Sequence, residues 1–291
     1  HTLYETDGYS WYHGGRNLFD PVAINVGSSK TFDISSNAKL GAARMSVNVS
    51  AGANSSILVT HNGVDKGTLN VMLNEYDKGN EARTAYNIIR SKPIDEVKIS
   101  TVSGSPSRLD YISFIWNEPL PAPQLQKASF PEPEYVQSIT NQDLHADGFA
   151  DMIIIIPTGL KLKAQAERLK AFHEQHDGMR VRIVPADELY NEFSSGTPDA
   201  NAYRRYLKML YDRAGSRDED MPKYLLLFGD CVWDNRMLTQ DCKTLNPNDY
   251  LLCYESENSF NEINCYVDDG FFCSLDANEG MNVNFFDKQD I

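Results

Sequence analysis

The chain has 291 residues, of which 41% are hydrophobic and 23% are charged, and this balance excludes a largely disordered protein. A formal net charge of -14 at pH 7 disfavours nucleic acids and anionic membranes as direct ligands, because both bind basic surfaces. The longest apolar runs, at residues 152–157 and 224–228, are strand-sized and too short to span a bilayer. The length predicts about two domains, and His1 in place of an initial Met predicts a processed or excised piece.

Residues 1–118 are predicted to form a β-sandwich domain. Apolar and polar residues alternate from residue 43 to residue 50, which predicts a strand with Ala43, Met45, Val47 and Val49 on one face. A strand predicted at residues 56–61 runs into Asn62-Gly63, a dipeptide that tolerates the positive φ angles of a tight hairpin. Further strands are expected at residues 69–73, 96–101 and 109–116. Several short strands with turn signals between them are typical of a sandwich.

A proline-rich linker is predicted at residues 119–140. Five prolines lie within fifteen residues, which is too many for a helix or a central strand. They are Pro119, Pro121, Pro123, Pro131 and Pro133. We therefore place the domain boundary in this segment.

Residues 141–291 are predicted to form an α/β domain with a mostly parallel sheet. Continuous apolar runs begin near Asp151, Met179 and Lys223, and strands of this kind are buried on both faces. A first helix is expected from its apolar positions Leu162, Ala166, Leu169 and Phe172. A second helix is expected to begin with Thr197 as N-cap and Pro198 at its first position, with Ala202, Tyr206, Met209 and Leu210 on its apolar face. Alternating strands and helices of this kind begin a doubly wound sheet.

In such a sheet the ligand lies beyond the carboxyl ends of the strands, which Pro157-Thr158-Gly159 and Gly229-Asp230 mark here. Cys231 follows directly and is a candidate nucleophile, but a thiolate nucleophile needs a nearby imidazole. The histidines of this domain lie before the first strand, at His145, or at the end of the first helix, at His173 and His176. A structural thiol is therefore the favoured interpretation of Cys231. His13-Gly14 lies in the β domain and is interpreted as a surface or packing histidine.

The last part of the chain gathers cysteines and acidic residues. All five cysteines lie between residues 231 and 273 without a Cys-x-x-Cys pair, which disfavours zinc, and their pairing stays open. The acidic residues could bind a basic side chain or coordinate calcium, and a solvated acidic loop is the favoured alternative. They are Asp249, Glu255, Glu257, Asp268, Asp269, Asp276 and Glu279. The sequence thus allows calcium as a cofactor, without assigning a metal-binding residue.

Four segments of the α/β domain resemble a known family. Residues 190–200 and 203–211 resemble the gingipain-type (C25) cysteine peptidases, and residues 225–236 and 252–260 more narrowly resemble the sortases of the type IX secretion system. The resemblance covers roughly residues 141–291, and the β domain before the linker is consistent with it. It implies a caspase-like α/β fold made of two sub-domains, so the fold expected is a β-sandwich followed by a partial caspase-like domain.

The resemblance also implies an activity and a place in the cell. Such a protein lies at the outer surface of a Gram-negative cell, where a Cys-His dyad removes C-terminal sorting domains from secreted cargo. The new end of the cargo is then joined to surface lipopolysaccharide. An outer-membrane β-barrel partner of the PorV type comes with this role.

The family's catalytic His and Cys lie in the second sub-domain, after a Gly-x-Gly-Arg strand expected just past Asp290-Ile291. No catalytic residue can therefore be assigned in this chain, and the substrate-groove candidates are Asp268, Asp269 and Asp230. The first hypothesis is a fragment of a surface cysteine peptidase and sortase that is inactive by itself. The alternative is a non-catalytic surface module, in which the sandwich binds glycan or protein and the α/β part is a scaffold.

Overall fold

The computed structural model describes residues 2–33, 41–73, 80–90, 94, 96–116, 132–135 and 141–276. The chain divides into two compact units, each described by itself. Unit 1 comprises His1–Gln137, Leu238–Gln240 and Glu257–Cys265, and unit 2 comprises Ser138–Met237, Asp241–Ser256 and Tyr266–Ile291. Most of the predicted linker lies outside the described residues. Across the described part of the chain, no helix has the length and hydropathy needed to cross a membrane.

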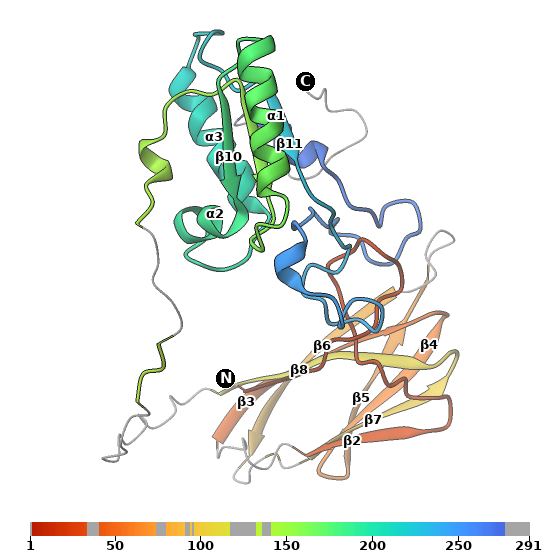
Figure 1. The fold of residues 1–291 in the computed structure, drawn as a ribbon. Coiled ribbons are helices and arrows are strands. Elements are labelled where there is room, and N and C mark those ends of the chain that lie inside the picture. The colour runs from red at the N-terminus through yellow and green to blue at the C-terminus, as the bar shows by residue number, and fades with distance from the viewer. Residues whose placement is uncertain are drawn as a thin grey trace. The chain divides into compact units, whose positions relative to one another are not determined.

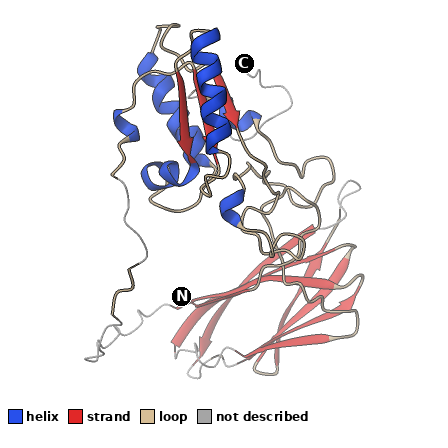
Figure 2. Ribbon diagram, viewed as in Figure 1, coloured by secondary structure: helices blue, strands red, loops and turns tan. Residues whose placement is uncertain are grey.

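Unit 1 contains two four-stranded antiparallel sheets, with strand orders β1-β8-β3-β6 and β2-β7-β4-β5 (Figure 2). Its strands are β1 (Thr2–Glu5), β2 (Ser29–Asp33), β3 (Gly41–Ala51), β4 (Ser55–His61), β5 (Val64–Val71), β6 (Asn80–Arg90), β7 (Glu96–Ser103) and β8 (Ser107–Trp116). Residues of both sheets, among them Val47 of β3 and Ile99 of β7, share one buried core. The antiparallel β structure expected from the sequence is confirmed, and β1, β2 and β6 are additional strands.

The hairpin predicted at Asn62-Gly63 is confirmed. Asn62 has a φ of 46° and Gly63 a φ of 73°, which are the left-handed values that a two-residue hairpin turn requires. The turn joins β4 and β5, whose residues His61 and Val64 pair directly. Asn and Gly adopt such angles at low cost, so the local sequence alone determines this connection.

The polar face of β3 is buried over the second half of the strand. Asn48 and Ser50 are fully buried, although they alternate with the apolar core residues of the same strand. The Asn48 amide donates to Asp110 Oδ2 at 2.6 Å, and Trp11 Nε1 donates to Ser50 Oγ at 3.0 Å. These hydrogen bonds compensate for the loss of water around the polar groups. Alternation correctly separates the two faces of β3 but does not reveal that Asn48 and Ser50, on the polar face, are also buried, whereas Arg44 is exposed.

Unit 2 contains a parallel three-stranded sheet with the order β10-β9-β11 (Figure 1). Its strands are β9 (Met152–Ile156), β10 (Val181–Pro185) and β11 (Tyr224–Leu227), and its helices are η2 (Leu144–Ala146), α1 (Lys163–His176), α2 (Ala186–Phe193), α3 (Asn201–Ala214), η3 (Pro247–Asp249) and η4 (Gly270–Cys273). Ile154 of β9 packs in a cluster with Ala166 of α1. Ile155 faces the opposite side, in a cluster that includes Leu189 of α2 and Tyr206 of α3. The prediction that the first apolar run is buried on both faces is confirmed.

The predicted helices need three corrections. The second predicted helix, α3, begins at Asn201 rather than at Pro198, because Asp199 forms a separate turn whose side chain accepts the Asn201 N–H at 2.9 Å. The expectation of two helices between the strands missed α2, whose first turn carries Asp187 and Glu188. Phe172 does not face the core: it is 53% exposed and stacks on His176.

Candidate functional site

Close backbone packing shapes the carboxyl edge of the parallel sheet. Gly159 follows β9 and donates its N–H to the Asn248 carbonyl oxygen at 2.7 Å. A Cβ at Gly159 would lie 2.7 Å from that oxygen, and a Cβ at Gly229, after β11, would lie 2.8 Å from Pro157 Cγ. Glycine is therefore required at both strand ends, because a side chain would force the segments apart. The two turns that the sequence marked as the functional edge do lie together.

Cys231 extends this edge beyond β11. It pairs with Leu251 in an isolated parallel bridge, and the Leu251 N–H donates to the Asp230 carbonyl oxygen at 2.9 Å. The Asp230 side chain turns back on its own backbone, where Oδ1 accepts the Cys231 N–H at 2.9 Å. Cys231 is exposed, whereas Cys253, two residues after Leu251, is buried. The edge thus presents a carboxylate and a thiol to solvent.

The substrate-groove candidates gather around the thiols at this edge. A hydrogen bond with Cys253 lowers the pKa of Cys231 to about 7, against opposing effects of burial and of the charges of Asp269 and Asp230. Burial raises the pKa of Cys273, and the charges of Asp269 and Asp268 raise it further. Asp268 also has a local structural role, because its Oδ1 accepts the Gly270 N–H at 2.8 Å at the start of η4. That these carboxylates bind substrate stays a prediction.

The histidines considered for a Cys-His dyad have acidic partners. Nδ1 of His145 lies 2.7 Å from Glu192 Oε2, and the imidazole stacks on Phe193. His173 and His176 both contact Asp177, at 2.6 and 2.7 Å. Since the end of α1 precedes the amino ends of the strands, these two imidazoles lie away from the edge that carries Cys231. None of these three imidazoles is brought to Cys231 within the described part of the chain, so its interpretation as a structural thiol stays the favoured prediction.

Histidine 13, the other histidine weighed from the sequence, lies in unit 1. Its side chain is exposed, which agrees with its interpretation as a surface residue. Gly15, two residues further on, packs closely against Ser259 of the same unit, because a Cβ at Gly15 would lie 2.4 Å from Ser259 Oγ.

The acidic residues of the late loops are spread over separate contacts. Asp249 pairs with Lys161 at 2.6 Å, and Asp276 accepts a hydrogen bond from Tyr211 Oη at 2.9 Å. Glu257 belongs to unit 1, where it lies 3.8 Å from Arg16, and Glu279 lies outside the described residues. Among the described residues, these separate contacts do not bring the late acidic residues together into a shared calcium site.

Among the described residues, three carboxylates do come together in unit 1. Ligand oxygens of Glu5, Asp7 and Asp110 lie within 4.8 Å of one another. They are hard oxygen donors of the kind that calcium prefers, but Asp110 Oδ2 already accepts the Asn48 amide at 2.6 Å. Three acidic groups by themselves do not establish a metal site, so none is assigned.

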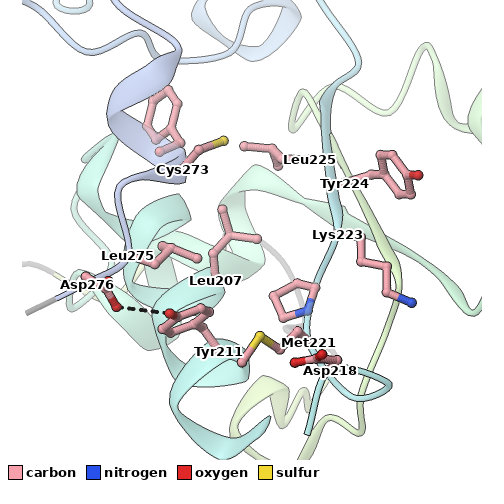
Figure 3. Close-up of a pocket in the computed structure, with 12 residues that line it drawn as sticks. Leu207, Tyr211, Asp218, Met221, Lys223, Tyr224, Leu225, Cys273, Leu275 and Asp276 are labelled. Carbon is pink, nitrogen blue, oxygen red and sulfur yellow. Dashed lines mark hydrogen bonds between the residues drawn. The ribbon is translucent and has the colours of Figure 1, made fainter. Parts of the chain in front are cut away.

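A pocket of about 600 Å³ lies beside β11 in unit 2 (Figure 3). Its apolar wall comes from β11, α3 and the residues around η4, and includes Leu207, Met221, Leu225, Phe272 and Leu275. Two of the lining residues are joined by a hydrogen bond, which Tyr211 Oη donates to Asp276 at 2.9 Å (Figure 3). Among the described strands, β11 pairs only with β9. Within the described residues, the pocket therefore lies next to a sheet edge whose second row of backbone hydrogen-bonding groups has no strand partner.

Comparison with known proteins agrees with this architecture. The model of peptidase family C25 matches residues 145–289, which form most of unit 2. The resemblance to the C25 family is confirmed. The crystal structure of dimeric latent PorU from Porphyromonas gingivalis covers 98% of this chain at 22% identity with a TM-score of 0.73. At this identity the match shows a shared fold. The chain spans 34% of the length of that PorU chain.

Other solved structures resemble a smaller part of the chain. A carbohydrate-binding module from Clostridium stercorarium in complex with cellobiose covers 40% of this chain and 94% of its own, at 15% identity and a TM-score of 0.27. A family 35 module from Clostridium thermocellum covers 40% of this chain and 91% of its own, at 16% identity and a TM-score of 0.28. These scores are too low to support a binding role. No curated protein sequence matches the chain.

Proposed function

We propose that this chain is the first part of a longer C25 cysteine peptidase, in which unit 2 forms half of a caspase-like domain. The observation that carries this proposal is the agreement between the C25 match and the parallel sheet of unit 2. In sheets of this type the ligand binds beyond the carboxyl ends of the strands. That edge here holds Asp230, Asp269 and close glycine turns, which suit one wall of a substrate groove.

The nucleophile and the base are proposed to lie downstream of this chain. A cysteine peptidase needs a thiolate beside an imidazole, so that the thiolate attacks the peptide carbonyl and the imidazolium protonates the leaving amine. The most accessible thiol of unit 2, Cys231, is surrounded by carboxylates rather than by an imidazole. Unit 2 would instead contribute Asp230, Asp268 and Asp269 as contacts for the substrate.

The remaining half of the domain is proposed to join at β11. The outer edge of β11 and the apolar pocket beside it provide both backbone groups and a hydrophobic surface for a further strand. A strand added here would extend the sheet and place its own carboxyl end next to Cys231. The catalytic dyad would then face the carboxylates across a common groove.

We further propose the sortase role that the sequence resemblance implies. In this role the full protein cleaves C-terminal sorting domains from type IX secretion cargo and joins the cargo to lipopolysaccharide. It would act on the surface of a Gram-negative cell with an outer-membrane β-barrel partner of the PorV type. The patterns at residues 225–236 and 252–260 and the shared fold with PorU support this role.

The test compares the full-length protein with residues 1–291 in a cargo cleavage assay. We expect thiol-dependent cleavage by the full-length protein and none by residues 1–291. Cys231→Ser in the full-length protein should leave the rate of cleavage largely unchanged. Thiol-dependent cleavage by residues 1–291 would place the nucleophile in this chain and refute the assignment. A full-length protein without any cleavage activity would favour a binding module instead.

A further inference from the structure

Two thiols meet at the carboxyl edge of the sheet. The bridge between Cys231 and Leu251 sets the two segments side by side, so Cys253 follows close to the extension of β11. Cys253 Sγ lies 3.4 Å from the carbonyl oxygen of Val232, the residue after Cys231. Both cysteines are free, and the mutual interaction of their thiols shifts the two pKa values in opposite directions. Two cysteines that are 22 positions apart in the sequence are thus brought close together at this edge.

Hydrogen bonds hold both thiol-bearing segments in place. Asn235 Nδ2 donates to the Cys253 carbonyl oxygen at 2.8 Å, and Asn235 Oδ1 accepts the Cys253 N–H at 3.0 Å. On the other side, the Asp230 carbonyl oxygen accepts the Leu251 N–H at 2.9 Å. A pair of groups positioned in this way reacts with a high effective concentration. The bridge between Cys231 and Leu251 places the two cysteines on neighbouring segments, as a disulfide between them requires.

The two thiols differ in exposure and in acidity. Cys231 is exposed, and its hydrogen bond with Cys253 lowers its pKa to about 7. Cys253 is 1% exposed, and the same hydrogen bond together with burial raises its pKa. A thiol with a pKa near the ambient pH reacts fastest in thiol–disulfide exchange, because it combines thiolate population with nucleophilicity. Cys231 is therefore suited to react first with a reagent in solution, and Cys253 to react second.

We propose that Cys231 and Cys253 form a reversible disulfide by exchange with a low-molecular-weight disulfide. The Cys231 thiolate attacks one sulfur of the reagent, whose S–S bond breaks and releases one thiolate. Cys253 then loses its proton to solvent and attacks the Cys231 sulfur, which releases the second thiolate. Two protein thiols are oxidised to one disulfide, and the reagent is reduced to two thiols. The contact that carries this proposal lies within unit 2 and does not depend on a peptidase function.

The disulfide would fasten the segment that contains Leu251 and Cys253 to the end of β11. This link lies beside Asp230, at the edge where the groove is proposed. Opening of the segment would then require breaking of a covalent bond in addition to the backbone hydrogen bonds. Amide hydrogen exchange at residues 251–256 should become slower in the oxidised protein, and treatment with a dithiol should restore the faster exchange.

The test treats residues 1–291 with oxidised glutathione and maps the products by mass spectrometry after digestion. We expect a peptide pair linked through Cys231 and Cys253 and reversal by dithiothreitol. Cys273→Ser is the matched control: it removes a thiol near the same carboxylates and should leave the link intact. A lasting glutathione adduct on Cys231 with Cys253 reduced, or links that mainly join other cysteines, would overturn the proposal.

Two further variants separate the two thiols. Cys231→Ser alters an exposed side chain, so the protein should fold and Cys253 should stay reduced under the same treatment. Cys253→Ser should trap the intermediate, with one glutathione on Cys231. Labelling of Cys231 by a thiol reagent should rise with pH around a midpoint of about 7. Fast formation of an adduct on Cys253 in Cys231→Ser would contradict the proposed order of reaction.

Discussion

The two edges of the parallel sheet in unit 2 are held together in different ways. At the amino edge one carboxylate, Asp151, accepts hydrogen bonds from the Arg180 guanidinium at 2.9 and 3.1 Å and lies 3.3 Å from Lys223 Nζ. At the carboxyl edge, Gly159 and Gly229 let neighbouring segments approach without side chains between them. At the amino edge the charged side chains pair with one another, whereas at the carboxyl edge the Asp230 carboxylate and the Cys231 thiol are exposed to solvent. The comparison shows why chemistry is expected at the second edge only.

The largest expected effect comes from filling the carboxyl edge. Gly159→Ala would place a Cβ 2.7 Å from the Asn248 carbonyl oxygen and lengthen the hydrogen bond there. We expect a loss of about 2–3 kcal/mol in the free energy of unfolding, measured with urea. Gly148→Ala is the matched control, because a Cβ there would meet no atom within 4 Å. Equal stabilities of the two variants would show that the edge is loosely packed.

A smaller loss is expected from Asp151→Asn at the amino edge. Hydrogen bonds from Arg180 hold the pKa of Asp151 well below its ordinary value of 3.8. The Arg180 side chain is 42% exposed, so solvent screening limits the loss at neutral pH to about 1–2 kcal/mol. A depressed carboxyl pKa stabilises the fold above the unfolded value, so the difference from the wild type should shrink as the pH falls below about 4.

The control for this variant is Glu174→Gln, which removes a surface ion pair with Lys170. Its effect should stay within about 0.5 kcal/mol at any pH, since exposed pairs of this kind contribute little. A pH-independent difference for Asp151→Asn would mean that packing rather than charge holds the amino edge.

A comparable but weaker dependence is expected at Glu192, which joins the segment before β9 to α2. Burial disfavours its charge, but hydrogen bonds from the Leu144 N–H, Gln142 and His145 outweigh burial and lower its pKa to about 2. Glu192→Gln should cost about 1 kcal/mol at pH 7. The difference should fade as the pH falls from 4.5 towards 2, because the wild-type carboxylate is protonated in that window. Thermal unfolding across this range measures it, and a constant difference would contradict the ionised role of Glu192.

The smallest expected effect concerns Asp269, on the carboxyl edge. Its negative charge raises the pKa of Cys231, so Asp269→Asn should shift the pH midpoint of Cys231 labelling slightly downward. High salt should reduce the shift, because it screens charges near the surface. An upward shift, or a shift unaffected by salt, would mean that Asp269 acts on Cys231 through structure rather than charge.

The sequence was sufficient wherever local chemistry decides the structure. The run from Met152 to Ile156 has no polar residue and becomes the central strand, and Asn62-Gly63 becomes the hairpin turn. The sequence did not predict the burial or exposure of residues that depends on tertiary contacts. Asn48 is buried beside Asp110, far along the chain, and Phe172 is exposed and stacks on His176 instead of packing on the sheet.

The candidate site likewise combines features that the local sequence predicts with features that depend on tertiary contacts. Its place at Gly229-Asp230 could be predicted, because strand ends can be recognised in the sequence. The contact of Cys231 with Cys253 could not, since it arises from irregular segments without a periodic pattern. The sequence indicated this region only through Gly159 and Gly229 at the strand ends and through the odd number of cysteines after them. The catalytic dyad is expected outside residues 1–291, so its residues could not be predicted from this sequence.

The order β10-β9-β11 also has a consequence for synthesis of the chain. The central strand is made first, and both of its neighbours emerge from the ribosome later. Until then β9, with four isoleucines in a row, is a short, uncharged segment of high β-propensity, which is the kind that associates with other chains. Helix α1 is synthesised next and can cover one face of β9. The other face of β9 stays uncovered until α2 and α3 have been synthesised. The yield of folded unit 2 should therefore depend on how quickly the ribosome completes the segment up to Ala214, where α3 ends.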